Sequence, residues 1–210
     1  VVCPAFNVAH ILRKTFEEIP KDKISEILLV DDGSTDDTAK LGEQLGMTVI
    51  SHERNKGYGA AQKTGYKEAI RKNADIAILI HADNQYDPTL TPKFIEPLIG
   101  GRADVVTGSR IHNYSSALKS GMPWWKYVAN RALTSAENLA FHTNLSDYHN
   151  GFRAYTSSVL RSIPYTDLSD SFDFDTDIII QCAIRNFRIQ EVPHQTRYRE
   201  ENSQMSFARG

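Results

Sequence analysis

Cysteine is scarce in this chain, and so are long apolar runs and any excess of charge of one sign. Only Cys3 and Cys182 are cysteines among 210 residues, which excludes a disulfide framework and a CxxC metal site. Two isolated cysteines are typical of small buried side chains in a reducing compartment, so we expect a cytoplasmic protein. No apolar run approaches the roughly 20 residues that span a bilayer, and no signal peptide is visible.

The formal net charge of -2 argues against a strongly basic nucleic-acid-binding protein, and we expect no nucleic-acid partner. Hydrophobic residues make up 40% of the chain and charged residues 24%, which is typical of a globular protein. A chain of this length buries about 70% of its extended surface without disulfide or metal staples. The sequence starts at Val1 inside an apolar run, without methionine, and we therefore expect a fragment of a longer protein.

Short apolar runs alternate with helical patterns in the first half of the chain. Residues 27–30 form a continuous apolar run, as in a central parallel strand covered on both faces. Further strands are predicted at 1–3, 49–50, 76–80 and 104–107, and helices at 8–18, 35–45, 58–70 and 88–99. Asn7 stands where the N-cap of the first helix is expected, and Gly46 closes the second. This alternation predicts βαβ units and a mostly parallel sheet.

The second half of the chain has a different character. Its predicted elements are a loop over 111–123, a helix over 124–141, a turn entering a strand over 147–153, a helix over 173–186 and a strand over 187–199. Pro193 lies inside the last strand and favours an edge position, because proline lacks the amide hydrogen that a central strand needs.

Acidic residues follow two of the predicted strands. Asp31 and Asp32 end the second strand, and Asp83 follows the fourth. Ligands of open parallel sheets bind beyond the carboxyl ends of the strands, so these acids are candidate binding residues. Alternatively, the Asp31-Asp32 pair belongs to a turn, with Ser34 and Asp37 forming a capping box for the next helix.

The segment His81-Ala82-Asp83-Asn84-Gln85 offers a carboxylate at a strand end, where it can hold a divalent cation next to a diphosphate. Mg²⁺ and Mn²⁺ are hard ions that prefer oxygen ligands, and diphosphate oxygens could complete their coordination. The alternative is a solvated loop acid.

A glycine pair, Gly57 and Gly59, precedes the third predicted helix, where backbone can approach an anionic ligand. Gln62 stands where a GxGxxG fingerprint needs glycine, which argues against a nicotinamide-binding fold. The alternative is a structural helix start. Arginines are scattered through the second half, where they form a solvated surface unless several converge on a phosphate; they are Arg110, Arg131, Arg153, Arg197 and Arg199.

Together these motifs resemble the family-2 glycosyltransferases of GT-A fold, and most of all the polyprenyl-phosphate sugar transferases of the dolichyl-phosphate mannose synthase type. The motifs that carry the resemblance occur in order over nearly the whole chain. They are Pro4-Ala5-Phe6-Asn7, Asp31-Asp32-Gly33-Ser34-Thr35-Asp36, Asn55-Lys56-Gly57, Ala82-Asp83-Asn84-Gln85, Gly108-Ser109-Arg110, Asn150-Gly151-Phe152-Arg153 and Glu191-Val192-Pro193.

The resemblance implies an α/β fold of GT-A type: a Rossmann-like, mostly parallel sheet with helices on both faces and a smaller mixed region on the acceptor side. It implies a single catalytic domain over 1–210, with a nucleotide-sugar-binding half at 1–110 and an acceptor-side half at 111–210. The implied reaction transfers a sugar, with inversion, from a UDP- or GDP-linked donor.

The resemblance also implies roles for particular residues. The donor-binding set is Pro4, Ala5, Asn7, Asp31, Asp32, Lys56, Gly57, Ala82 and Asp83. Asp83 matches the last acid of the family's DxD motif and would bind Mn²⁺ or Mg²⁺. His81 stands where the first acid is expected; imidazole binds Mn²⁺ but is a poor Mg²⁺ ligand. The implied acceptor-side set is Gln85, Arg110, Arg131 and Arg153.

A hydroxyl acceptor requires a general base near the anomeric carbon. The resemblance makes Asp147 the first candidate, because the family places an acid just before the Asn150-Gly151-Phe152-Arg153 turn. Asp175 and Asp177 are alternatives, with helix capping near Asp173 as the structural interpretation. A phosphate acceptor is already largely ionised and needs arginines more than a base. Arg110 would then be the catalytic arginine.

Trp124-Trp125-Lys126 opens a helix with aromatic and basic character, which favours a membrane surface. The resemblance implies a lipid-phosphate acceptor, presented at the cytoplasmic face of that membrane. The alternative is that both tryptophans belong to the core. Two other functions remain open. A nucleotide-binding or interaction module without transfer activity is favoured by His81, whereas a nucleotidyltransferase would need a glycine- and basic-rich loop after the first strand.

Overall fold

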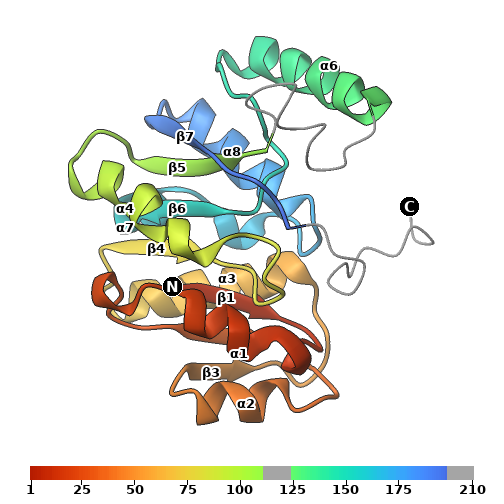
Figure 1. The fold of residues 1–210 in the computed structure, drawn as a ribbon. Coiled ribbons are helices and arrows are strands. Elements are labelled where there is room, and N and C mark those ends of the chain that lie inside the picture. The colour runs from red at the N-terminus through yellow and green to blue at the C-terminus, as the bar shows by residue number, and fades with distance from the viewer. Residues whose placement is uncertain (111–123, 198–210) are drawn as a thin grey trace.

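The structure is a computed structural model that describes residues 1–110 and 124–197. Its strands are β1 (Val2–Ala5), β2 (Leu28–Asp31), β3 (Thr48–Ser51), β4 (Ile76–Leu79), β5 (Val105–Ser109), β6 (Arg153–Thr156) and β7 (Ile189–Pro193). In the described part of the chain they form one seven-stranded sheet in the order β3-β2-β1-β4-β6-β5-β7 (Figure 1). Only β6 runs antiparallel to its neighbours, β4 and β5, so the sheet is mostly parallel as predicted.

Side chains of the central strands are buried on both faces of the sheet. Along β2, Leu28 and Val30 belong to the core on one face, and Leu29 belongs to the core on the other. This alternation follows from the period of two in a strand, and it explains the continuous apolar run in the sequence. Burial on both faces makes this sheet a rigid platform for the loops at its carboxyl edge.

Helices cover both faces. One face packs against α1 (Ala9–Glu18), α2 (Thr38–Gln44) and α4 (Thr91–Ile99), and the other against α3 (Tyr58–Arg71), α7 (Ser157–Ser162) and α8 (Phe174–Ile184). Three short 3₁₀ turns are described, at Lys21–Lys23, Pro88–Leu90 and Tyr165–Asp167. Helix α6 (Trp124–Phe141) lies beyond the end of the sheet and contacts α8 (Figure 1).

Two predicted helix starts are wrong. Helix α1 is preceded by Val8, and Asn7 adopts a left-handed backbone (φ 53°) instead of capping it. The backbone N–H of Asn7 donates to Ser34 Oγ at 2.8 Å, and its side-chain oxygen accepts from the Thr35 N–H at 2.8 Å. Ser34 is therefore occupied by the β1 loop, and no capping box forms with Asp37, which starts α2 without a side-chain cap bond. These bonds tie the loops after β1 and β2 together.

Other predictions are confirmed by the structure. Gly46 follows α2 with φ 78°, the conformation that favours glycine at a helix end, and β7 with Pro193 is an edge strand. The strand expected after 147–153 begins at Arg153, whereas α7 was not predicted. The predicted loop over 111–123, Arg199 and the end of the predicted last strand lie outside the described residues, as do the side chains of Trp124 and Lys126.

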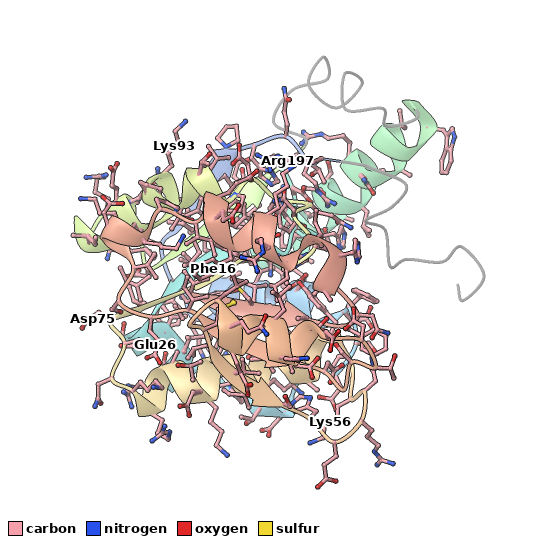
Figure 2. All side chains as sticks on the ribbon, turned by 60° about the horizontal axis from the view of Figure 1, so that its bottom comes forward. Phe16, Glu26, Lys56, Asp75, Lys93 and Arg197 are labelled. Carbon is pink, nitrogen blue, oxygen red and sulfur yellow. The ribbon has the colours of Figure 1, made fainter. Side chains whose placement is uncertain are left out.

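The register of the sheet brings the carboxyl ends of its strands to one edge. Ala5 pairs with Asp31, and Asp31 pairs with Ser51, so the loops that follow β1, β2 and β3 start side by side. Glu26 and Asp75 precede β2 and β4 and lie on the opposite side of the molecule from Lys56 (Figure 2). The second half of the chain supplies β6 and β7, so the two halves share one sheet.

Candidate active site

The acids that end β2 differ in what they bind. Asp32 is buried, and its carboxylate accepts hydrogen bonds from the backbone N–H groups of Lys56 and Gly57, both at 2.9 Å; His52 Nδ1 lies 2.6 Å from the same carboxylate. Among the residues that the structure describes, Asp31 accepts one bond, from the Ser34 N–H at 3.2 Å. A carboxylate has about four lone-pair sites, so Asp31 keeps more capacity for a ligand than Asp32 does. The resemblance implied donor binding for both acids.

The loop after β3 owes its shape to these bonds. Gly57 has φ 108°, which side-chain-bearing residues rarely adopt, and α3 begins directly after it. The structural interpretation of this glycine motif is therefore correct for the helix start. The same geometry presents Arg54 and Lys56 at the carboxyl edge of the sheet, where the sequence placed donor binding.

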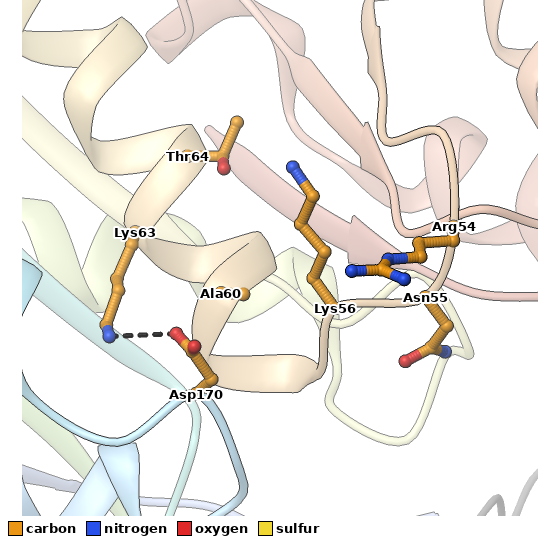
Figure 3. Close-up of a pocket in the computed structure, with 7 residues that line it drawn as sticks. All are labelled: Arg54, Asn55, Lys56, Ala60, Lys63, Thr64 and Asp170. Atoms are coloured by element: carbon orange, nitrogen blue, oxygen red, sulfur yellow. Dashed lines mark hydrogen bonds and ion pairs between the residues drawn. The ribbon is translucent and has the colours of Figure 1, made fainter.

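A pocket of about 610 Å³ opens beside this loop (Figure 3). It is lined by Arg54, Asn55, Lys56, Ala60, Lys63, Thr64 and Asp170. Lys63 pairs with Asp170 at 2.9 Å, and Thr64 Oγ1 lies 2.9 Å from His52 Nε2. Within residues 1–110 and 124–197, Arg54 and Lys56 form no ion pair, so the pocket wall carries excess positive charge suited to an anion.

The loop after β4 is held from two sides. Asp83 accepts a bond from the Gln85 N–H at 3.0 Å, and burial raises the pKa of this carboxyl above its ordinary value. Arg197 donates its backbone N–H to the Gln85 carbonyl at 2.9 Å and forms ion pairs with Glu18 at 2.5 Å and Asp87 at 3.1 Å. Arg197 therefore fixes this loop against α1.

His81, Tyr58 and Asp175 form a cluster at the centre of the carboxyl edge. His81 Nε2 lies 2.5 Å from the Tyr58 hydroxyl, which donates to Asp175 Oδ2 at 3.1 Å. Gln62 Nε2 donates to the other oxygen of Asp175 at 2.9 Å. A Cβ atom on Gly151 would lie 2.6 Å from the Tyr58 hydroxyl and 2.7 Å from His81 Nε2, so only glycine fits over the cluster.

The donor set at this edge fits a divalent cation only with help from a ligand. In the described parts of the chain, no group of three or more His, Cys, Asp or Glu side chains could hold a metal ion. Asp83 offers a hard carboxylate with one oxygen uncommitted, and His81 has only Nδ1 left for coordination. A bound diphosphate and water would have to supply the remaining ligands.

Asp147 and Arg110 form a closed pair. Arg110 Nε donates to Asp147 Oδ2 at 2.8 Å and Nη2 to Oδ1 at 3.0 Å, and Asp147 is 1% exposed. Burial alone would raise the pKa of Asp147, but the Arg110 guanidinium and further hydrogen bonds outweigh it, and the pKa is lowered. A buried carboxylate with a lowered pKa is a weak proton acceptor, so this geometry argues against Asp147 as the base and makes it a support for Arg110.

Arg153 corrects another expectation. It is fully buried, and its guanidinium donates to the Asp175 carbonyl, to the Tyr148 carbonyl at 2.5 Å and to Thr107 Oγ1 at 3.3 Å. It therefore holds the start of α8 against β6, and its buried position leaves it no access to an acceptor. The sequence motif Asn150-Gly151-Phe152-Arg153 did not indicate that this arginine is buried.

The remaining predicted residues are placed as follows. Arg131 is exposed on α6. Asp177 accepts from the Ser169 N–H at 3.4 Å instead of joining the cluster around His81. Asp173 precedes α8 without a side-chain cap bond, so the capping interpretation does not hold for it. Tyr58 was missed as a site residue, because its place on the apolar face of a predicted helix suggested only packing.

Comparisons with known proteins identify the family to which this sheet and site belong. Residues 1–163 match the family described as Glycosyl transferase family 2. The UDP-N-acetylglucosamine–dolichyl-phosphate N-acetylglucosaminyltransferase of Methanococcus voltae is 30% identical over 227 residues, covering 100% of this chain and 88% of that protein. The chain therefore belongs to glycosyl transferase family 2, which confirms the resemblance.

Two further proteins illustrate the likeness. The polyprenol monophosphomannose synthase of Mycolicibacterium smegmatis is 26% identical over 174 residues, covering 80% of this chain and 64% of that one. The crystal structure of glucosyl-3-phosphoglycerate synthase from Mycobacterium tuberculosis, in complex with Mn²⁺, UDP and glucosyl-3-phosphoglycerate, matches with a TM-score of 0.71 at 20% identity. The match covers 94% of this chain and 70% of that one, and it supports the predicted fold.

Proposed function

We propose that the chain transfers a sugar, with inversion, from a UDP-linked donor to the phosphate of a polyprenyl phosphate, with the help of a divalent cation. The observation that carries the proposal is Asp83 at the carboxyl end of β4, on the same edge as Asp31; within residues 1–110 and 124–197 one of its carboxylate oxygens has no partner. The name of the M. voltae relative joins a UDP-sugar to dolichyl phosphate, which favours UDP over GDP as the nucleotide.

Asp31 is the acid with room for the nucleoside, because it accepts only one bond within the described chain. The backbones of Pro4 and Ala5 pair with β2 next to it, which supports a place for the base beside them. Asn7 would act there indirectly, since its side chain already bridges to Thr35. These contacts hold the base and ribose, and they leave the diphosphate to reach toward the loop after β4.

The diphosphate end of the donor requires positive charge. Lys56 lies at the mouth of the basic pocket, and Gly57 lets its loop approach closely. Asp83 holds the cation, with Ala82 and Gln85 shaping the loop around it. When bound, the cation neutralises charge on the leaving diphosphate. The M. tuberculosis neighbour was crystallised with Mn²⁺ and UDP, and another structure of it contains Mg²⁺ and UDP.

On the acceptor side a phosphate needs a positively charged side chain instead of a general base. A phosphate with a second pKa of about 6 is largely ionised at neutral pH, so its oxygen can attack the anomeric carbon without losing a proton to the protein. Arg110 is fixed by Asp147 and donates further to the His149 carbonyl at 2.8 Å, so its charge is held in one place. Arg131 is exposed on α6 and is free to approach a phosphate from that side.

Helix α6 has an exposed apolar face. Trp125, Val128 and Leu139 are 59%, 54% and 79% exposed. Their positions share one side of a helix, because 125, 128, 132, 136 and 139 follow helical spacing. No helix in the described ranges is long and apolar enough to cross a bilayer. An amphipathic helix that lies in the membrane surface would bring the site to a lipid phosphate, and we place it at the cytoplasmic face.

The test is transfer itself. Purified protein is incubated with labelled UDP-sugars or GDP-mannose and a short-chain prenyl phosphate, in Mn²⁺, Mg²⁺ or a chelator, and the label is counted in the organic phase. We expect transfer from one UDP-sugar, with Mn²⁺ restoring more activity than Mg²⁺ after chelation. The Asp83→Asn variant should lose transfer, whereas Asp22→Asn, which removes an exposed carboxylate of the 3₁₀ turn Lys21–Lys23, should keep it.

The result also separates transfer from mere binding. A shift of the melting point with UDP but no labelled lipid under any metal condition would overturn the transferase proposal and favour a binding module. Full activity in chelator would show that transfer needs no divalent cation. Transfer to a soluble hydroxyl acceptor at the same rate in the wild type and in Arg110→Ala would contradict a phosphate acceptor.

A further inference from the structure

The cluster of Tyr58, His81 and Asp175 carries an inference that rests on the proposed function and names how one of its residues is held. All three side chains meet at one phenol oxygen. His81 Nε2 lies 2.5 Å from the Tyr58 hydroxyl and Asp175 Oδ2 lies 3.1 Å from it. That hydroxyl has a single hydrogen, so it can donate to only one of these two neighbours.

The remaining bonds decide which neighbour receives the hydrogen. Gln62 Nε2 donates to Asp175 Oδ1 at 2.9 Å, while the Tyr66 hydroxyl donates to Gln62 Oε1 at 3.0 Å, which fixes the amide orientation. Asp175 is thus used as an acceptor, and an ionised carboxylate can only accept. Tyr58 therefore donates to Asp175, and His81 Nε2 must carry a hydrogen and donate to Tyr58.

This direction leaves the lone pair of His81 on Nδ1. Tyr86 packs against the imidazole with ring centroids 4.7 Å apart, and Gly151 closes over the Nε2 side, so the ring is held from several directions. In the described residues Nδ1 has no hydrogen-bond partner. It is also not one of the buried side-chain atoms that lack a partner, so a ligand can reach it. Asp83, two residues along, has an uncommitted carboxylate oxygen.

We infer that Tyr58 and Asp175 are positioning residues that hold His81 in the Nε2–H form, so that its Nδ1 binds the Mn²⁺ of a bound Mn²⁺–UDP complex together with Asp83. A histidine that ligates a metal through one nitrogen commonly donates its other N–H to a carboxylate or a comparable acceptor. Here the phenol of Tyr58 stands between the imidazole and the carboxylate. Nitrogen ligation at this position selects Mn²⁺ over Mg²⁺.

The first measurement is the tautomer of His81 in the ligand-free protein, by two-bond ¹H–¹⁵N correlation NMR. The resonances are assigned by their loss in His81→Asp. We expect a protonated-type signal at Nε2 and a lone-pair-type signal at Nδ1. The reverse assignment would overturn the inference. In Asp175→Asn the amide can donate to the Tyr58 oxygen, so the Tyr58 hydroxyl would donate to His81 Nε2. We therefore expect the imidazole proton on Nδ1 in this variant.

The second measurement is pulsed EPR of Mn²⁺ with UDP and no acceptor, which reports the metal without turnover. We expect a nitrogen coupling that changes when the protein carries ¹⁵N-histidine and that disappears in His81→Asp, although this variant still binds Mn²⁺. Mn²⁺ that binds without nitrogen coupling overturns this inference alone. Failure of Mn²⁺ to bind in the presence of UDP overturns it together with the cation of the proposed function.

A double-mutant cycle separates positioning from mere stability. Tyr58→Phe should weaken Mn²⁺ binding about 10- to 100-fold, the usual loss when a partner of a metal-ligating histidine is removed. In a His81→Asp background the same change should have no effect on Mn²⁺ affinity, because Tyr58 acts through His81. An equal loss in both backgrounds would contradict the inference. Tyr165→Phe, a buried tyrosine of the core, is the matched control and should leave Mn²⁺ binding unchanged.

Discussion

His52 Nδ1 lies 2.6 Å from Asp32 Oδ1, and both side chains are almost fully buried. The pair links the loop after β3 to the end of β2, because Asp31 pairs with Ser51 and places His52 beside Asp32. Together with the two backbone N–H groups that Asp32 accepts, the contact makes this acid the anchor of residues 52–57. Asp31, its neighbour in sequence, accepts only one hydrogen bond within the described part of the chain.

Asp32→Ala should therefore act mainly on stability. The change removes three bonds to a carboxylate, and we expect a loss of about 1.5–3 kcal/mol in the free energy of unfolding, the range for one bond to a charged group, since the backbone donors can partly turn to water. Urea denaturation measures it. Asp37→Ala removes an exposed acid without a cap bond and should stay within about 0.5 kcal/mol of the wild type. Equal stabilities of the two variants would refute the anchor role.

Asp31→Asn should act mainly on the nucleotide. The amide oxygen of asparagine can still accept the turn bond from the Ser34 N–H, so the unfolding free energy should change less than in Asp32→Ala. Affinity for UDP should fall about tenfold, which is roughly 1.4 kcal/mol. Isothermal titration calorimetry in the presence of Mn²⁺ checks this. Unchanged affinity for UDP would show that Asp31 does not bind the nucleoside.

Asp147→Asn tests the closed pair with Arg110 through pH. The pKa of Asp147 is lowered in the folded protein, so its stabilising effect is present above the unfolded pKa of about 3.9 and is lost as pH falls through the lowered folded value. At pH 7 the free energy of unfolding of the wild type should exceed that of the variant by up to about 3 kcal/mol, the lower end of the range for a broken buried ion pair. The gap should shrink below pH 4.

The same variant distinguishes support from base catalysis. If Asp147 only holds Arg110, the rate of transfer to a prenyl phosphate falls but the pH dependence of kcat keeps its shape. Loss of an essential ionisation from the kcat profile in Asp147→Asn would instead identify Asp147 as the working base.

Arg153→Met should destabilise the fold by about 2–6 kcal/mol, because it leaves the carbonyls of Asp175 and Tyr148 without their donor at about 1–3 kcal/mol each. Thermal and urea unfolding measure the effect. Arg13→Met, on the exposed side of α1, is the matched control and should be near neutral. A stable Arg153→Met variant that fails only with the acceptor would restore the acceptor-binding role predicted from the sequence.

Trp125→Glu combined with Leu139→Glu should reduce co-sedimentation with anionic vesicles and slow transfer to a long-chain polyprenyl phosphate in those vesicles. Transfer to a short-chain acceptor in detergent should be unaffected, because the changes lie on the exposed face of α6. Ile99→Glu alters an equally exposed apolar side chain at the end of α4 and serves as the control. Vesicle binding that is undiminished in the double variant would rule out α6 as the membrane surface.

The sequence predicted most elements of the fold because its strands are buried on both faces and its helices have apolar periodicity. It also placed Asp31 and Asp83 on one edge, since strand ends can be read along the chain. It could not show which acid is already occupied, because His52 reaches Asp32 only through the β2–β3 register. The cluster around Tyr58 was missed for the same reason: its members come from α3, the loop after β4 and α8.

The position of β6 between β4 and β5 has a consequence for biosynthesis. When β5 leaves the ribosome, the neighbour that joins it to β4 has not yet been made, so both strands must wait with open edges until Arg153–Thr156 emerges. Open strand edges invite pairing with other chains, and pairing over long sequence separation is slow. We therefore expect residues 1–110 not to fold alone as a stable unit, and fragments that stop before residue 153 should aggregate.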